Sequence, residues 1–149
     1  MSREENYYKQ IERMLYSYKA AVVEIKFIEL EIERMESNYE GVGAVVLSEK
    51  VAPTNKITSR VESEVLNRER DLDGLESRKR AKEIEVEKVD NILSLLNDDE
   101  YRLIELRYFR KLGFKEIAER MAEDEKNLIK KRTKVIESKL VPILKIITH

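Results

Sequence analysis

A continuous heptad pattern near the N-terminus restricts the fold of this chain more than any other feature. Counting from Tyr7 in alternating steps of four and three residues, ten successive positions are apolar or aromatic: Tyr7, Ile11, Met14, Tyr18, Ala21, Ile25, Ile28, Ile32, Met35 and Tyr39. A pattern kept for more than four heptads is typical of a helix that packs along its length against another helix. Residues 3–39 are therefore predicted to form one long helix, whose apolar face Leu15, Val22 and Leu30 widen.

A connector is expected to follow this helix. Gly41 and Gly43 are predicted to end the helix, and residues 40–56 to form the connector. The stretch 41–53 is more apolar than most loops, and it either folds over the tip of a hairpin or forms a contact surface.

A second long helix is predicted to begin near Thr58 or Ser59, which are good N-cap residues. The same stepping from Val61 to Leu96 meets apolar residues at eight of eleven positions. Three basic residues interrupt the pattern: Arg68, Lys79 and Lys82. Two helices of similar length joined by one connector predict an antiparallel hairpin. A lone hairpin buries little apolar surface, so a homo-oligomer is expected, with a dimer favoured.

Shorter elements are predicted after residue 97. Asp98 or Asp99 is expected to cap a helix over 99–110, followed by a turn at 111–113, a helix over 114–122, and a helix over 125–140 with an apolar tail. The side chains expected to point inward are Leu103, Leu106, Tyr108 or Phe109, Phe114, Ile117, Ala118 and Met121. The predicted fold class is all-α: a long, coiled-coil-like antiparallel hairpin over 1–97, followed by a C-terminal helical unit over 98–149.

Composition argues against several function classes. The chain contains no Cys, and its one His is His149, so neither a disulfide framework nor a metal site is expected. No glycine-rich phosphate loop and no nucleophile beside a base is found, so neither an enzyme nor a cofactor is expected. The consecutive carboxylates of Asp98, Asp99 and Glu100 suit capping better than a metal site, because neighbouring residues on a helix do not face one another. No apolar run is long enough to span a membrane and no signal peptide is found, which predicts a cytoplasmic protein with no membrane partner.

Charge is distributed unevenly along the chain. Residues 110–149 contain 11 Lys or Arg against 6 Asp or Glu, whereas the whole chain has a net charge of −1. Between Lys126 and Lys134 there are five basic residues and no acidic one. A basic patch confined to one end of a chain is typical of a protein that binds phosphates, although a solvated helix face would look the same.

Residues 103–140 resemble the helix-turn-helix of sigma-factor region 4 and its phage relatives. The resemblance lies in Leu-Arg-Tyr at 106–108, an aromatic residue at 114, and Glu-Ile-Ala at 116–118. With the long helical part before it, the chain is similar to phage late-gene transcription regulators of the ArpU and RinA type. The resemblance implies that the last of the short helices enters the major groove of double-stranded DNA.

The residues expected to contact DNA lie mainly on that last short helix. They are Lys115, Lys126, Asn127, Lys130, Lys131, Arg132 and Lys134. Asn can bond adenine and Lys can reach guanine, whereas Arg132 and Lys134 are expected to contact phosphates. Ala122 and Glu123 depart from the family, which has glycine and then an apolar residue there. Either Leu128 is buried in the usual register, or the turn is one residue longer and Ile129, Thr133, Ile136 and Leu140 are buried.

Three functions fit these features. The first is a sequence-specific transcriptional regulator of phage or prophage genes, for which RNA polymerase is a further partner. The second is a small terminase subunit that recognises packaging-site DNA, and a closed ring of many chains would distinguish it from a dimeric regulator. The third is a coiled-coil scaffold that binds only protein.

Overall fold

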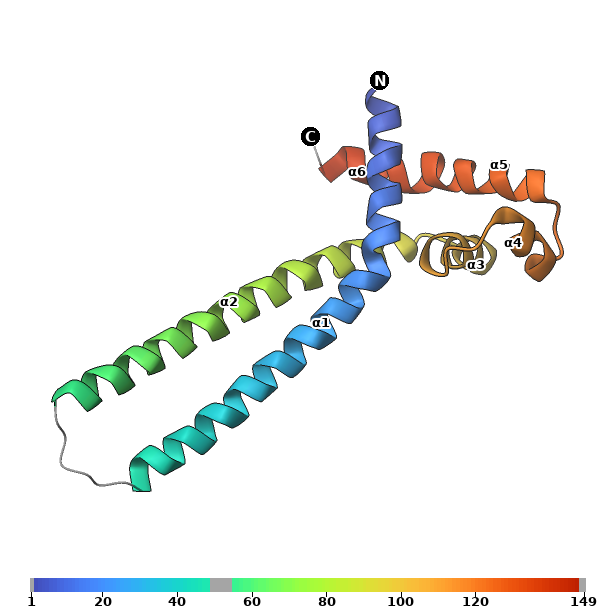
Figure 1. The fold of residues 1–149 in the computed structure, drawn as a ribbon. Helices are drawn as coiled ribbons and strands as arrows, with labels where there is room; N and C mark the ends of the chain where they lie inside the picture. The colour runs from blue at the N-terminus through green and yellow to red at the C-terminus, as the bar shows by residue number, and fades with distance from the viewer. Residues whose placement is uncertain (1, 49–54, 148–149) are drawn as a thin grey trace. The chain divides into compact units, whose positions relative to one another are not determined.

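The computed structural model describes residues 2–48 and 55–147, with side-chain environments at 2–38 and 60–147. Within these residues the fold is all-α, as predicted, and contains no strand. The elements are α1 (Arg3–Ser48), α2 (Asn55–Leu93), α3 (Asp98–Ile104), η1 (Glu105–Phe109), α4 (Phe114–Met121), α5 (Glu125–Val135), η2 (Ile136–Leu140) and α6 (Val141–Ile147). Figure 1 labels α1 to α6. By their packing they form a hairpin unit, Val22–Glu83, and a terminal unit, Met1–Ala21 with Ile84–His149.

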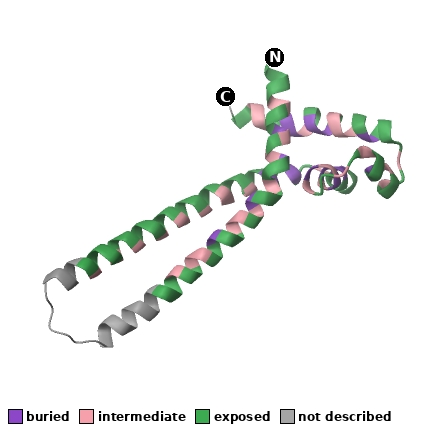
Figure 2. Ribbon diagram, in the orientation of Figure 1, coloured by how far each residue is buried: buried purple, intermediate pink, exposed green. Residues whose placement is uncertain are grey.

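The long helices α1 and α2 pair as the predicted antiparallel hairpin (Figure 1). Every position of the α1 heptad pattern from Tyr7 to Met35 is buried or half-buried, and Tyr39 lies outside the described side chains. Every position of the α2 pattern from Val61 to Leu96 is likewise buried or half-buried, as the alternation of colours along both helices in Figure 2 illustrates. The periodicity therefore identified the contact faces of both helices.

Carboxylates on α1 accommodate two of the three basic residues that interrupt the α2 pattern. Lys79 Nζ lies 3.4 Å from Glu29 Oε1, and Lys82 Nζ lies 3.5 Å from Glu24 Oε2. Arg78 Nη2 also donates to Glu24 Oε1, at 2.9 Å. The aliphatic stems lie along the helix contact while the charged ends reach its edge, as long basic side chains commonly do. Charge pairs at these edges also favour one alignment of the two helices.

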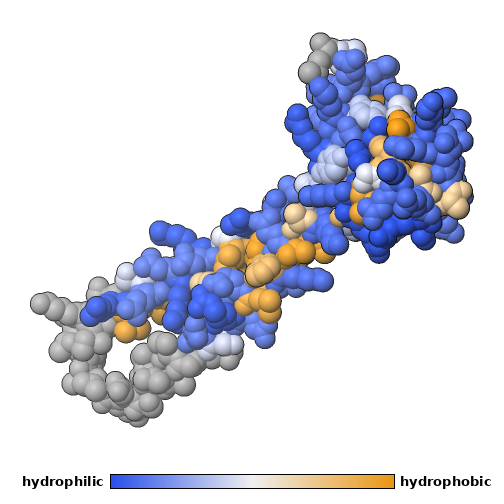
Figure 3. All heavy atoms as spheres, turned by 45° about the vertical axis from the view of Figure 1, so that its right-hand side comes forward, coloured by the Kyte–Doolittle hydropathy of each residue, from blue (hydrophilic) through white to orange (hydrophobic). Residues whose placement is uncertain are grey.

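Three expectations for the hairpin were wrong. The helix does not end at Gly41 and Gly43 but continues to Ser48, since a glycine inside a helix costs only about 1 kcal/mol relative to alanine. The second helix begins at Asn55 and not at Thr58 or Ser59, and the rest of the expected connector, 49–54, lies outside the described residues. Leu30 does not widen the buried face but is 61% exposed. Hydrophobic side chains are visible on the hairpin surface in Figure 3.

The main apolar core lies in the terminal unit and joins both ends of the chain. It gathers buried residues from the start of α1, the end of α2, and the helices from α3 to α6: Ile11, Leu15, Val89, Ile92, Leu93, Ile104, Tyr108, Ile136, Leu140 and Val141. Tyr18 packs at its edge, where it stacks on Phe109 at 4.8 Å and donates to Asp90 Oδ1 at 2.6 Å. Tyr7 and Tyr18 of the α1 heptad pattern therefore pack against this core, as the pattern predicted.

The cap of α3 differs from the one expected. Asn97, and not Asp98 or Asp99, is the N-cap: its side chain accepts from the Glu100 backbone N–H, and Glu100 accepts from the Asn97 N–H. Burial alone would raise the pKa of Glu100, but this backbone hydrogen bond and the ammonium of Lys139 hold it below its usual value. Glu100 thus links the start of α3 to η2, the π-helical turn that contains Lys139.

Two π-helical turns, η1 and η2, interrupt the C-terminal helices. The second ends at Leu140, two residues before Pro142, whose ring in a regular helix would clash with the carbonyl of Ser138, four residues earlier. The wider turn accommodates the proline, and the apolar tail continues as α6. Val141 is buried, whereas Ile146 and Ile147 are exposed. The tail therefore packs partly on its own terminal unit.

Gly74 lies inside α2, as expected, with no atom within 4 Å of where a Cβ would stand. Gly74→Ala should raise the free energy of unfolding by roughly 0.5–1 kcal/mol, because alanine favours the helix and limits the unfolded chain. Gly113→Ala is the matched control. It also has open space but occupies the N-cap of α4, where alanine is disfavoured, so no comparable gain is expected. Urea unfolding followed by circular dichroism measures both, and equal gains would contradict this explanation.

Candidate nucleic-acid interface

Two short helices, α4 and α5, are joined by a three-residue turn and supported by a small apolar cluster. The buried members of the cluster are Leu103, Leu106, Ile117 and Leu128, with Leu112, Phe114, Ala118 and Met121 packed against them. These include most of the side chains that the sequence predicted to point inward. The cluster fixes α4 and α5 against the α3–η1 helix.

The turn between α4 and α5 contains a strained residue. Ala122 has φ 52° and ψ 45°, the left-handed conformation, and its backbone N–H donates to the Ala118 carbonyl. This conformation costs a residue with a Cβ about 1 kcal/mol or more, a cost that glycine would avoid. Ala122 therefore forms the turn at an energetic cost.

Burial along α5 distinguishes the two registers that the sequence left open. Leu128 is fully buried, whereas Ile129 is 37% exposed. The alternative of a longer turn that buries Ile129 is therefore wrong, although Ile136 and Leu140 are buried as that alternative also expected. With Leu128 facing the cluster, the opposite side of α5 is solvent-exposed.

Most of the predicted DNA-contacting residues lie on this exposed side. Lys126, Asn127, Lys130 and Lys134 are all exposed on α5, and Lys115 is exposed in the first turn of α4. Beside them a shallow hollow is lined by Ile129, Lys130, Thr133, Lys134, Glu137 and Ser138. The described surface of α5 thus presents solvent-exposed cations and one exposed amide.

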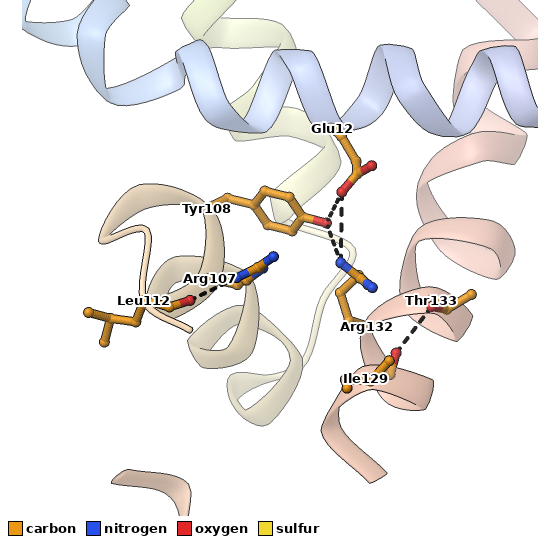
Figure 4. A network of polar contacts seen from close by, with 7 residues as sticks. All are labelled: Glu12, Arg107, Tyr108, Leu112, Ile129, Arg132 and Thr133. Carbon is orange, nitrogen blue, oxygen red and sulfur yellow. Dashed lines mark hydrogen bonds and ion pairs between the residues drawn. The ribbon is translucent and has the colours of Figure 1, made fainter. Parts of the chain in front are cut away.

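Lys131 and Arg132 differ from the other residues of the basic run. Lys131 is half-buried, with its Nζ 3.9 Å from Glu123 Oε2. Arg132 points inward, toward Glu12 on α1 and Tyr108 on η1 (Figure 4). Its Nη1 lies 3.8 Å from Glu12 Oε2 and 3.4 Å from the Tyr108 hydroxyl. Arg132 therefore anchors α5, and the structure does not place it with the exposed lysines.

Tyr108 is the centre of this network. It is fully buried, and its hydroxyl donates to Glu12 Oε2 at 2.7 Å. Burial, and to a smaller extent this hydrogen bond to a carboxylate, raises the pKa of Tyr108 well above its usual value of 10. The hydroxyl therefore stays protonated. The network connects α1 to α5 through one neutral and two charged side chains.

A second set of contacts surrounds Phe114 at the start of α4. The guanidinium carbons of Arg107 and Arg132 lie 4.6 and 5.0 Å from the centre of its ring. Arg107 Nη1 also donates to the Leu112 carbonyl at 3.1 Å. Cation–π contacts of this kind contribute about 0.5–2 kcal/mol each and hold α4, η1 and α5 together.

Sequence reasoning missed Glu12 and Arg107. Glu12 precedes Tyr108 by 96 residues, and neither residue type nor spacing links them. Arg107 lies within the recognised Leu-Arg-Tyr stretch, so that stretch could have identified it as a structural residue. Both side chains are half-buried and make contacts within the fold, so neither is solvated as the exposed lysines are.

Across the residues that the structure describes, no group of three His, Cys, Asp or Glu side chains could hold a metal ion. None of the described helices is long and apolar enough to cross a membrane. The exposed side of α5 presents cations on a helix whose other side is buried at Leu128 and Val135.

The fold defines an all-α protein built from a helical hairpin unit and a multi-helix terminal unit. The chain belongs to the DUF722 family, whose model matches residues 7–139 and is described as a protein of unknown function. No curated protein matches the chain, and no solved structure matches it.

Tyr108→Phe should lower the free energy of unfolding by about 1–2 kcal/mol, because a hydrogen bond to a carboxylate is lost at a partly buried site. The folded-state pKa of Tyr108 lies above the unfolded value of 10, so its contribution is present below pH 10 and is lost as the pH rises further. The decline in stability above pH 10 should accordingly be shallower in the variant. Chemical unfolding at pH 7 and across the alkaline range measures both effects.

Tyr16→Phe is the matched control for that change. Tyr16 packs edge-on against Tyr108 with ring centres 4.7 Å apart, and it is 38% exposed. Removing its hydroxyl retains the ring contact and should change stability by less than about 0.5 kcal/mol. Equal losses from the two substitutions would show that the Tyr108–Glu12 bond has no special role.

Proposed function

We propose that this protein is a cytoplasmic, sequence-specific DNA-binding regulator of phage or prophage genes. In this proposal α4 and α5 form a helix-turn-helix, and α5 enters the major groove of double-stranded DNA. The protein acts as a homo-oligomer, with RNA polymerase as a further partner. The resemblance of residues 103–140 to sigma-factor region 4 supports the assignment to transcription.

The observation that supports this function best is the sidedness of α5. Its buried side is apolar at Leu128 and Val135, while its exposed side has Lys126, Lys130 and Lys134 at intervals of four residues. Residues four apart share one side of a helix, so the three cations form a row. A row of solvated cations on a rigidly supported helix is suited to the phosphate backbone and the groove between the strands.

The other exposed residues fit roles within the same complex. Asn127 lies in the first turns of α5, from which a recognition helix reads bases, and an asparagine can bond adenine through two hydrogen bonds. Lys115 lies in the first turn of α4, where the helix dipole favours a phosphate. Arg132, by contrast, acts as the anchor that holds α5 against α1 and η1.

Lys126→Ala with Lys130→Ala should weaken binding to DNA while leaving the fold intact, because both side chains are exposed. We expect affinity for a short random-sequence duplex to fall by roughly tenfold or more, and the salt dependence of binding to decrease by about two units, one for each phosphate contact. Fluorescence anisotropy over a range of salt concentrations measures both quantities.

The charge-matched control is Lys19→Ala with Lys88→Ala, since both lysines are exposed and lie on α1 and α2. It should bind like the parent protein. Ile117→Asp is the structural contrast: it places a charge in a fully buried site and should unfold α4 and α5 at a cost of several kcal/mol. If the parent protein binds no DNA even at low salt, the proposal fails and a protein-binding scaffold takes its place. A closed ring of many chains would instead favour a terminase subunit.

A further inference from the structure

The side of α1 that faces away from α2 has an unusual surface within the hairpin unit. Val23, Phe27 and Leu30 are 44%, 69% and 61% exposed. Their spacing of four and three residues repeats the heptad pattern, but on the side opposite the one that contacts α2. We call these three residues the outer stripe. A solvated helix needs no such pattern, whereas a helix with two helical neighbours does.

The charges beside the outer stripe are arranged in a particular order. Lys26, next to Phe27, lies on one flank, while Glu31 lies on the other. Lys26 is exposed, and the side chain of Glu31 is 44% exposed. Arg34 hydrogen-bonds Glu31 and holds its pKa below the usual value, so Glu31 is ionised at neutral pH. A carboxylate has about four acceptor positions, so Glu31 can also receive a lysine from outside.

These charges distinguish the two ways in which a second α1 could lie on the outer stripe. In a parallel pair, each flank faces the opposite flank of the partner, and a residue meets the one about five positions later. Lys26 then faces Glu31 of the partner subunit twice, by symmetry. In an antiparallel pair, like flanks meet, so Lys26 would not reach Glu31 of the other copy. Only the parallel arrangement forms the Lys26–Glu31 pair.

We propose that two copies of this chain associate through the outer stripe, with their α1 helices parallel and in register. Val23, Phe27 and Leu30 each meet their own counterpart, and a Lys26–Glu31 pair closes each side. The interface is self-complementary, as a two-fold axis requires. The stripe spans only about 10 Å of helix at 1.5 Å per residue, so the association is weak and reversible. This inference does not depend on DNA binding.

Sedimentation equilibrium of the full chain without DNA tests the association. The average mass should rise from 17.6 kDa toward twice that value as the concentration approaches about 100 µM. Phe27→Glu should keep the protein monomeric over this range without unfolding it, because Phe27 is exposed. Asn67→Glu, which adds the same charge at an exposed site on α2, should behave like the parent. A parent protein that stays monomeric, or that associates equally well with Phe27→Glu, would overturn the proposal.

Charge exchange tests the direction of pairing. Lys26→Glu should weaken association at least severalfold, and adding Glu31→Lys should restore it, because the pair is re-formed with its signs reversed. In an antiparallel pair Lys26 would lie near Glu33 instead, so restoration by Glu33→Lys rather than by Glu31→Lys would overturn the parallel arrangement. Circular dichroism verifies that each variant is folded.

The absence of cysteine from the chain permits a direct test of the register. Leu30→Cys should form a disulfide-linked dimer under mild oxidation, because parallel pairing brings the two position-30 residues together. Glu36→Cys, an exposed position on α1 away from the outer stripe, is the control and should remain largely monomeric. Cross-linking only in a mixture of Phe27→Cys and Leu30→Cys proteins would indicate antiparallel pairing and would contradict the proposal.

Discussion

Burial of Tyr108 is the interaction on which the terminal unit depends. The ring belongs to the cluster that joins the start of α1, the end of α2 and the C-terminal helices, so residues near both ends of the chain share one core. A phenol can be buried there only if its hydroxyl has a partner, and Glu12 supplies one. Glu12 in turn lies beside the guanidinium of Arg132, which limits the cost of a partly buried carboxylate. The Tyr108 hydroxyl thus has both an acceptor in Glu12 and a donor in Arg132.

This arrangement decides which cations of the basic run can meet a partner. Arg132 is committed to the core on the inner side of α5, and Lys131 lies near Glu123. Leu128 is fixed in the small cluster beneath α4, so Lys126 and Lys130 must project outward from the same helix. A run of five basic residues thus separates into an anchor, an edge residue and a solvated row. The helix can be held rigidly without using the charges proposed to contact DNA.

The sequence predicted the parts of the fold that arise from periodicity. Both hairpin helices, their contact faces, and the short helices α3, α4 and α5 follow from apolar spacing, which responds directly to burial. The ends of the hairpin helices were wrong because Gly41, Gly43, Thr58 and Ser59 allow a helix end without requiring one. The cap at Asn97 was missed because three neighbouring carboxylates offered the same chemistry. The Glu12–Tyr108–Arg132 network joins residues far apart in sequence, and no local pattern encodes such a contact.

Lysine and arginine have three different roles in this chain, and composition alone cannot separate them. On α2, Lys79 and Lys82 occupy positions where a hairpin usually has apolar residues, and they reach glutamates on α1. In the terminal unit, Arg107 and Arg132 stack on Phe114 from two helices. On the outer side of α5, Lys126, Lys130 and Lys134 project into solvent at intervals of four residues, opposite the buried Leu128 and Val135. A count of charges would treat all of these residues as one basic surface. Burial separates the solvated α5 lysines from the basic residues that the fold uses. A solvated lysine can exchange water for a partner without breaking a contact of the fold, which is what a binding surface requires.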